Sequence, residues 1–367
     1  MKSTHNKHLI CPVYCLFLFF LLLFSGCAEK PAPEEIPAEE KIPKESWELV
    51  LITGPLGLED SMTQEAWLGL QDHAAESGAS CRTWQPKSND YLSIMEEAIN
   101  AGAHLLISPS SLQEEALLQL QSRYPDVFFL TVDYLPGGTD KNADFVPENC
   151  HALLFAEEEA GFLAGYAAVM DDYVKLGFAG ESRQEGYGLG FLQGVDAAAN
   201  MLGRDVELYY GYTDKLPPGA SILSMIYPWY IDETEIIFGC GKHMLKPLIK
   251  AAEASCSAII AADTDQQALS DTVLLSAVKD IRGAVHSALQ RYSSQNLPGG
   301  SISLGNLKNG GVSLAMESCR LKNFRQQDYE KLLETLSRGE YSIHRADEDG
   351  VSPESLCSER IRLRSPD

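Results

Sequence analysis

Charged side chains follow two apolar runs in the second half of the chain, and their types suit the binding of a small polar molecule. Asp263 comes directly after SAIIAA, Asp265 follows two residues later, and Lys279 comes directly after VLLSAV. Carboxylates accept hydrogen bonds from the hydroxyls of a diol, and an ammonium group donates to oxygen. Charged groups at the end of a buried strand are tolerated where donors or water meet them. We therefore expect these residues to face a cleft, although either aspartate could instead cap the next turn and Lys279 could begin a solvated helix.

Residues that follow other predicted strands extend this candidate site. They bring hydroxyl groups, an aromatic ring and a glycine turn to the ends of the strands. Tyr212 could stack on a flat part of a ligand or could pack in a hinge. The wider set of candidate ligand-binding residues is Asp60, Ser61, Met62, Thr63, Ser108, Tyr212 and Gly239.

The elements that must position these residues alternate between strand and helix. From Trp47 onward the chain reads as repeated strand–helix units, and the alternation restarts after residue 150. In the first helical segment, Ser61 and Gln64 form a predicted capping box and Gly78 a predicted end. Acids at 157–159 open a later helix, where they favour the helix dipole. The pattern predicts an α/β fold with two doubly wound, Rossmann-like lobes and a ligand cleft at the carboxyl ends of the strands.

The first 46 residues predict export and attachment to a membrane surface. The apolar stretch 9–27 ends in LFSGC, and its core is too short for a comfortable membrane span. Small Ser25 and Gly26 before Cys27 resemble a bacterial lipobox, in which the cysteine thiol is diacylated. A plain signal peptide or an uncleaved anchor is the alternative. Residues 28–45 are rich in Pro and Glu and predict a solvated tether.

These patterns divide the chain into five predicted parts. They are a lipoprotein signal peptide at 1–26, a lipidated tether at 27–46, a first lobe at 47–152 with 280–308, a second lobe at 153–279 with 309–340, and a C-terminal tail at 341–367.

Composition argues against several classes of function. The 367 residues include 52 acidic and 29 basic side chains, and the net charge of −23 argues against nucleic-acid binding. The sequence has no G-x-S-x-G or H-E-x-x-H motif and no dinucleotide fingerprint, so we predict no enzyme activity, no cofactor and no metal site. Six cysteines follow the predicted signal and lipid site without metal-ligand spacing, and we expect mostly buried thiols rather than disulfides at Cys81, Cys150, Cys240, Cys256, Cys319 and Cys357.

Several motifs in order resemble the basic membrane protein (BMP) family of lipoproteins, which are substrate-binding components of ABC importers. The resemblance extends over about residues 47–339, and its motifs are FAEEEAGFLAGYAA, LGFAG, ADTDQ, VLLSAVK and GNLKNGGVSLA. It implies a type I periplasmic binding protein fold with hinge crossings between the lobes. It also implies that Asp263 and Lys279 bind a ribose and that Tyr212 stacks on the base.

The first loop departs from the family pattern, because Met62 and Thr63 stand where the family carries an aromatic residue and an amide. A thioether can still lie against a ring, although the stacking is weaker. We expect a monomeric, lipid-anchored protein on the extracytoplasmic face that captures a nucleoside, with purine nucleosides favoured, and docks on an ABC permease. The alternative is a surface sensor with the same fold but no role in transport.

Overall fold

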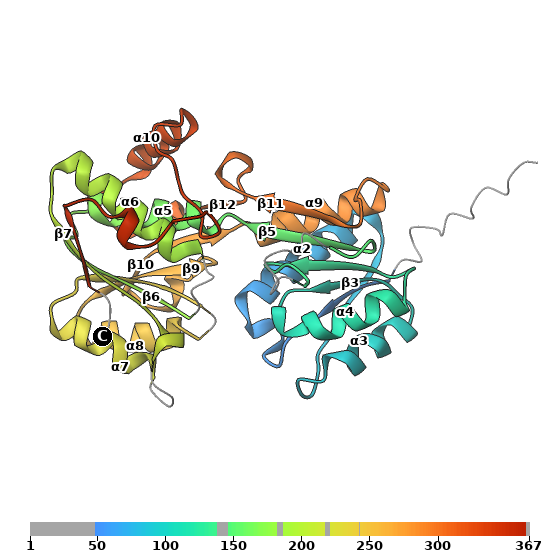
Figure 1. Cartoon of the computed structure of the whole chain (residues 1–367). Helices are drawn as coiled ribbons and strands as arrows, with labels where there is room; N and C mark the ends of the chain where they lie inside the picture. The colour runs from blue at the N-terminus through green and yellow to red at the C-terminus, as the bar shows by residue number, and fades with distance from the viewer. Residues whose placement is uncertain (1–47, 138–145, 182–185, 217–220, 242, 365–367) are drawn as a thin grey trace, which may run out of the picture. The chain divides into compact units, whose positions relative to one another are not determined.

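Two parallel sheets organise the protein in the computed structural model, which describes residues 48–137, 146–181, 186–216, 221–241 and 243–364. Residues 44–367 form one compact unit that contains both sheets (Figure 1). The predicted α/β class is confirmed. The predicted signal peptide, tether and lipid-modified Cys27 lie outside the described residues.

The first sheet has six strands in the order β11-β5-β4-β3-β1-β2, and every pairing in it is parallel. Its strands are β1 Glu48–Ile52, β2 Ser80–Trp84, β3 Ala103–Ser108, β4 Phe128–Val132, β5 Cys150–Phe155 and β11 Ser301–Gly305. Helices α3 Tyr91–Asn100 and α4 Glu114–Arg123 cover one face, and α2 Ser61–Ser77 and α9 Ile281–Ser293 cover the other (Figure 1).

The second sheet has seven strands in the order β12-β10-β9-β8-β6-β7-β13, all parallel except β12, which is antiparallel to β10. Its strands are β6 Lys175–Gly180, β7 Val206–Tyr212, β8 Ile236–Cys240, β9 Ala258–Asp263, β10 Val273–Lys279, β12 Val312–Leu314 and β13 Ile361–Arg364. Helices α5 Glu157–Met170 and α6 Gly186–Leu202 cover one face, α7 Ile222–Ile231 and α8 Leu245–Ser255 cover the other, and α10 Gln326–Ser337 lies outside (Figure 1).

Short 3-10 segments connect several of these elements. They are Gly57–Glu59, Ser111–Gln113, Thr213–Lys215, Gln267–Leu269, Leu307–Asn309, Met316–Ser318 and Glu354–Leu356.

The chain crosses between the sheets three times, between β5 and α5, between β10 and α9, and between β11 and β12. The predicted first lobe stops at residue 152, whereas β5 continues in the first sheet to Phe155. The assignment of two separate lobes stays a prediction, because both sheets belong to one compact unit.

Local sequence explains where the helices begin. The side chain of Asp60 accepts a hydrogen bond from the backbone N–H of Thr63 and caps α2, so the prediction of Ser61 as the cap is wrong by one residue. An aspartate at this position satisfies an N–H group that has no partner within the helix. Gly78 ends α2 in the left-handed conformation, with φ of 76°, as predicted.

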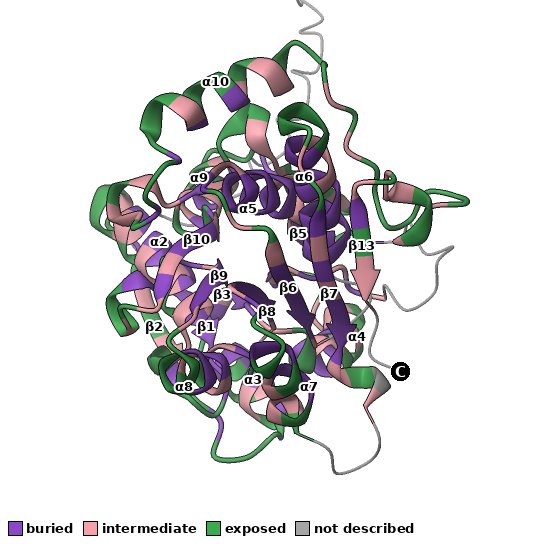
Figure 2. Cartoon of the chain, turned by 90° about the vertical axis from the view of Figure 1, so that its left-hand side faces the viewer, coloured by how far each residue is buried: buried purple, intermediate pink, exposed green. Residues whose placement is uncertain are grey.

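The C-terminal tail extends the second sheet. Strand β13 pairs with β7 in parallel along its free edge (Figure 2). The Gln193 side chain on α6 holds the tail upstream of this strand, because it bonds both the N–H and the carbonyl of His344. The tail therefore covers the edge of β7, and β13 is the edge strand of the second sheet.

Helices α5 and α6 pack unusually closely through glycines. A Cβ atom added at Gly165 would lie 2.1 Å from the carbonyl oxygen of Phe191, and one at Gly194 would lie 2.0 Å from that of Phe162. Backbone atoms cannot move aside as a flexible side chain can, so these positions require glycine. This contact matters for function because the first turns of both helices lie at the candidate site described below.

We predict that Gly165→Ala lowers the free energy of unfolding by about 1 to 3 kcal/mol, because the methyl group forces the two helices apart. Gly54→Ala is the matched control, since its Cβ would meet nothing nearer than the Tyr91 hydroxyl at 3.9 Å. Urea unfolding of both variants checks the prediction. Equal stability of the two variants would contradict the account of the helix contact.

Candidate functional site

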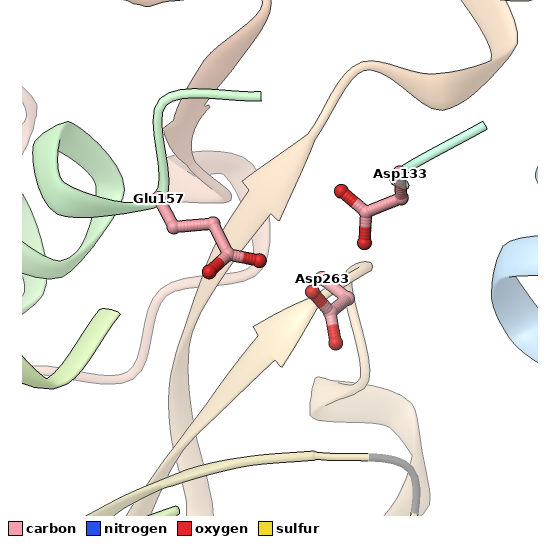
Figure 3. Close-up of side chains that lie close together, drawn as sticks. All are labelled: Asp133, Glu157 and Asp263. Atoms are coloured by element: carbon pink, nitrogen blue, oxygen red, sulfur yellow. The ribbon is translucent and has the colours of Figure 1, made fainter. Parts of the chain in front are cut away.

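A buried lysine surrounded by three carboxylates forms the centre of the candidate site. The Lys279 ammonium lies 2.7 Å from an oxygen of Asp133, 2.6 Å from one of Glu157 and 2.9 Å from one of Asp263. Figure 3 shows the three carboxylates converging on one space. We call these four residues the Lys279 cluster.

Strand ends and one helix start bring the cluster together. Asp133 follows β4 of the first sheet, whereas Asp263 and Lys279 are the last residues of the neighbouring strands β9 and β10 of the second sheet. Glu157 is the first residue of α5, directly after a crossing between the sheets. The cluster therefore joins residues of both sheets.

Both aspartates adopt a backbone conformation that is uncommon for residues other than glycine. The φ angle is 65° at Asp133 and 71° at Asp263. Residues held in this left-handed region cost about 1 kcal/mol or more and concentrate at functional sites. The two left-handed turns direct both carboxylates toward the same ammonium.

Lys279 uses its hydrogen-bonding capacity inside the cluster. An ammonium group has three N–H donors, and this one donates hydrogen bonds to Asp133 and Glu157 and forms an ion pair with Asp263. Its side chain is 1% exposed, whereas the carboxylate side chains are each about one-fifth exposed. The surface that the cluster offers to a ligand therefore comes from its three acidic side chains and not from Lys279.

The Tyr187 side chain on α6 contacts the Lys279 cluster. The Lys279 ammonium lies 5.1 Å from the centroid of the Tyr187 ring, and the backbone N–H of Asp263 donates to the tyrosine hydroxyl at 3.3 Å. A cation over an aromatic face is attracted by the ring quadrupole. Burial raises the pKa of Tyr187 well above its usual value, so the hydroxyl stays protonated.

The crowding of acids changes the protonation of Asp133. Burial raises the pKa of its carboxyl group, Lys279 lowers it, and Glu157 and Asp263 raise it again, giving a pKa of about 7. Burial lowers the pKa of Lys279, but the three carboxylates outweigh it and hold the pKa well above its usual value. Lys279 is therefore charged at neutral pH. The ammonium occupies the place that a metal ion would take among these carboxylates.

Comparison with known proteins decides the family. The family model Bmp, described as ABC transporter substrate-binding protein PnrA-like, matches residues 50–343. The chain is a member of the Bmp family. The chain is therefore a substrate-binding protein of an ABC transporter, which binds a small molecule outside the cytoplasm and is not an enzyme.

Individual relatives are distant. The ABC transporter nucleoside-binding protein BmpA of Lactococcus lactis is 25% identical over 293 residues, which cover 73% of this chain and 81% of the relative. Basic membrane protein B of Borreliella burgdorferi is 26% identical over 255 residues, covering 67% of this chain and 70% of the relative.

Solved structures share the fold of this Bmp protein. An ABC transporter solute-binding protein of Aeropyrum pernix has a TM-score of 0.61 at 20% identity, with 84% of each chain covered. A transcriptional activator of the comK gene from Bacillus halodurans has a TM-score of 0.64 at 18% identity, covering 81% of this chain and all of the other.

The predicted pair Asp263 and Lys279 lies together in this Bmp protein, at 2.9 Å. Asp265 lies outside the cluster and matches the capping alternative. Its Oδ1 accepts hydrogen bonds from the backbone and side chain of Gln267, and its Oδ2 accepts one from Ser318. These contacts hold the turn after β9.

The first loop contributes helix capping. The Asp60 carboxylate accepts from both the N–H and the hydroxyl of Thr63, at 2.9 and 2.7 Å, and Thr63 is buried. Ser61 begins α2, and Met62 is half-buried against the core. The ligand-binding roles of Asp60, Ser61, Met62 and Thr63 stay predictions.

Three further predicted residues lie in the interior. The Ser108 hydroxyl is fully buried between Gln113 and Tyr134, at 2.7 and 2.5 Å. Gly239 lies under Leu248, whose Cδ1 would be 2.0 Å from an added Cβ. The Tyr212 ring is 6% exposed and packs edge-to-face on Phe178. This arrangement matches the packing alternative for Tyr212, and its stacking role stays a prediction without support from its exposure.

Sequence reasoning did not single out Asp133, Glu157 or Tyr187. Asp133 directly follows the apolar run FFLTV, which is the same signal that identified Asp263. Glu157 was explained by the helix dipole, although its Oε2 also accepts from the N–H of Gly186 at 2.8 Å. Tyr187 stands in a glycine-rich helix, where the sequence carries no sign of its contact with Lys279.

The remaining predictions concern cysteines and membrane spans. All six cysteines are free thiols, as expected. Cys150 and Cys240 are buried, whereas the other four are intermediate or exposed, so the prediction that most of them are buried is wrong. Within the part of the chain that the structure describes, no helix has the length and apolar character needed to cross a membrane.

We predict that Lys279→Met lowers the free energy of unfolding by about 3 to 5 kcal/mol at pH 7.5, because three carboxylates then face one another without a cation. The loss shrinks at acid pH, where the carboxylates become protonated. Lys331→Met is the control, since that side chain is 74% exposed and its loss costs about 0.5 kcal/mol or less. Chemical denaturation measures both, and equal losses would contradict the central role of Lys279.

We predict that Asp133 makes the stability of the folded protein depend on pH between about pH 4 and pH 7. Its pKa is raised to about 7 from 3.8, so the folded chain holds a proton that the unfolded chain releases. The free energy of unfolding therefore falls as pH rises from about 4 to about 7, by up to about 1.4 kcal/mol per pH unit. Subtracting the profile of Asp133→Asn isolates this slope, and identical profiles would contradict the assignment.

Proposed function

We propose that this Bmp protein is the lipid-anchored solute-binding component of an ABC importer and captures a nucleoside or a similar small polar ligand, with purine nucleosides favoured. The observation that carries the proposal is the Lys279 cluster at the strand ends of both sheets. Ligands of open α/β sheets bind outside the carboxyl ends of the strands. The nucleoside-binding name of the Lactococcus lactis relative supports the ligand class.

The proposed ligand contacts use the side chains of the Lys279 cluster that remain partly exposed. Asp263 uses Oδ1 for Lys279 and is about one-fifth exposed, so we assign it the hydroxyls of the ribose. A carboxylate suits this role because its oxygens are acceptors for two neighbouring hydroxyl groups. Lys279 was predicted to touch the sugar, but its side chain is 1% exposed and donates hydrogen bonds to Asp133 and Glu157. We propose that it acts by positioning Asp263.

Capture also requires contacts from the first sheet. Asp133 brings the first sheet to the same ammonium as Asp263. A ligand that lies on both carboxylates would connect the two sheets and exclude water from the cluster, as in hinge closure of binding proteins. Direct contact with a permease and attachment through Cys27 complete the proposal.

We predict that Asp263→Asn weakens nucleoside binding by about 10- to 100-fold, because a hydrogen bond to a charged group contributes about 1.5 to 3 kcal/mol. Calorimetry of the full chain with adenosine, guanosine, inosine and cytidine measures the effect. Asp205→Asn is the control, since that side chain is 86% exposed and pairs with Arg360 away from the cluster.

Unchanged affinity in Asp263→Asn would remove this residue from the site. The absence of binding by all four nucleosides would contradict the ligand class. Uptake of labelled nucleoside by cells with and without the chain separates import from a sensing role.

A further inference from the structure

The Lys279 cluster carries more negative than positive charge. Three carboxylates against one ammonium leave a net charge of −2 when all four groups are ionised. The carboxylates lie within 4.8 Å of one another, so their mutual repulsion is strong wherever water is scarce. In the described structure, each of the three acidic side chains keeps about one-fifth of its surface exposed to solvent.

A ligand that covers the cluster removes this water. Under the function proposed above, the ligand is a neutral nucleoside, which offers hydroxyl donors but no positive charge. Lys279 cannot supply more compensation, because its single charge is already shared among the three carboxylates. Loss of solvent favours the neutral form of a carboxyl group, and a proton from solvent is the simplest way to reduce the buried charge.

We propose that the Lys279 cluster takes up one proton when a neutral ligand binds, so that capture is coupled to protonation. This inference rests on the proposed function and adds a condition to it. The proton passes from water or buffer to a carboxylate oxygen, and the cluster then carries a net charge of −1.

Asp133 is the group that receives the proton. Its carboxylate has Lys279 as its hydrogen-bond partner among the described residues, whereas Glu157 also accepts from the N–H of Gly186. The charged and titratable groups that face it are Lys279 from β10, Glu157 from α5 and Asp263 from β9, with Tyr187 from α6 beneath the ammonium. A protonated Asp133 can donate to a neighbouring carboxylate, which replaces a repulsion by a hydrogen bond.

The direction of the pH dependence follows from this assignment. The pKa of Asp133 is about 7 in the free protein, and a bound ligand raises it further by removing water. Affinity is therefore constant below about pH 7. Above that pH it falls, approaching tenfold per pH unit until the pKa of the complex is reached.

The test is calorimetry of the full chain with adenosine, and with guanosine as a second probe, in phosphate and in Tris at pH 7.5. These buffers have different heats of ionisation, so proton uptake makes the measured binding heats differ. We expect uptake approaching one proton per ligand, and a dissociation constant that rises several-fold from pH 7 to pH 8.

Two variants locate the proton. Asp133→Asn removes the titrating carboxyl group, so the binding that it retains should occur without proton uptake and with a flat pH profile. Asp72→Asn is the matched control, since Asp72 pairs with Arg282 on the surface, and it should behave as the wild-type protein does. Buffer-independent heats in the wild-type protein, or proton uptake that persists in Asp133→Asn, would overturn the proposal.

If the protein does not bind nucleosides at all, the calorimetry gives a different result. In that case neither nucleoside produces a binding heat in the wild-type protein or in Asp72→Asn. Carboxyl NMR of the free chain then decides the inference. A carboxyl group that titrates near pH 7 and is lost in Asp133→Asn supports a proton site in the cluster, and no such group overturns it.

Discussion

The charge balance around one buried ammonium constrains this protein more than any other interaction. Lys279 is almost fully buried and needs acceptors for each of its N–H groups. An unpaired charge in that position would be costly to bury. Hydrogen bonds to Asp133 and Glu157 and an ion pair with Asp263 stabilise it. These contacts require the ends of β4, β9 and β10 and the start of α5 to lie close together.

The fold supplies these groups through its connections. Parallel strands place their carboxyl ends at one edge of each sheet, and the crossing before α5 brings Glu157 to the same place. The close glycine contacts between α5 and α6 keep Tyr187 beneath the ammonium and Glu157 beside it. The packing of α5 against α6 on the second sheet therefore determines the geometry of the Lys279 cluster at the edge of that sheet.

Much of the fold and part of the site could be predicted from the sequence. The alternation of apolar strands and capped helices predicts the α/β class, and a charged residue after a buried strand identifies Asp263 and Lys279. The same pattern was present at Asp133, but nothing local in the sequence shows that strands β4 and β10 bring it to Lys279. Asp60 and Thr63 hydrogen-bond each other at the start of α2, and the Ser108 hydroxyl lies in a buried hydrogen-bond network. Helix caps and core hydrogen bonds use the same residue types as ligand binding, so the sequence alone did not distinguish these roles.

The most direct test of the central claim is a crystal structure of the chain with the ligand that co-purifies with it, identified by mass spectrometry. The account predicts ligand hydroxyl groups on Asp263, with the Lys279 ammonium still between Asp133, Glu157 and Asp263. A ligand bound away from these carboxylates, or a Lys279 side chain that has left them for solvent, would contradict it.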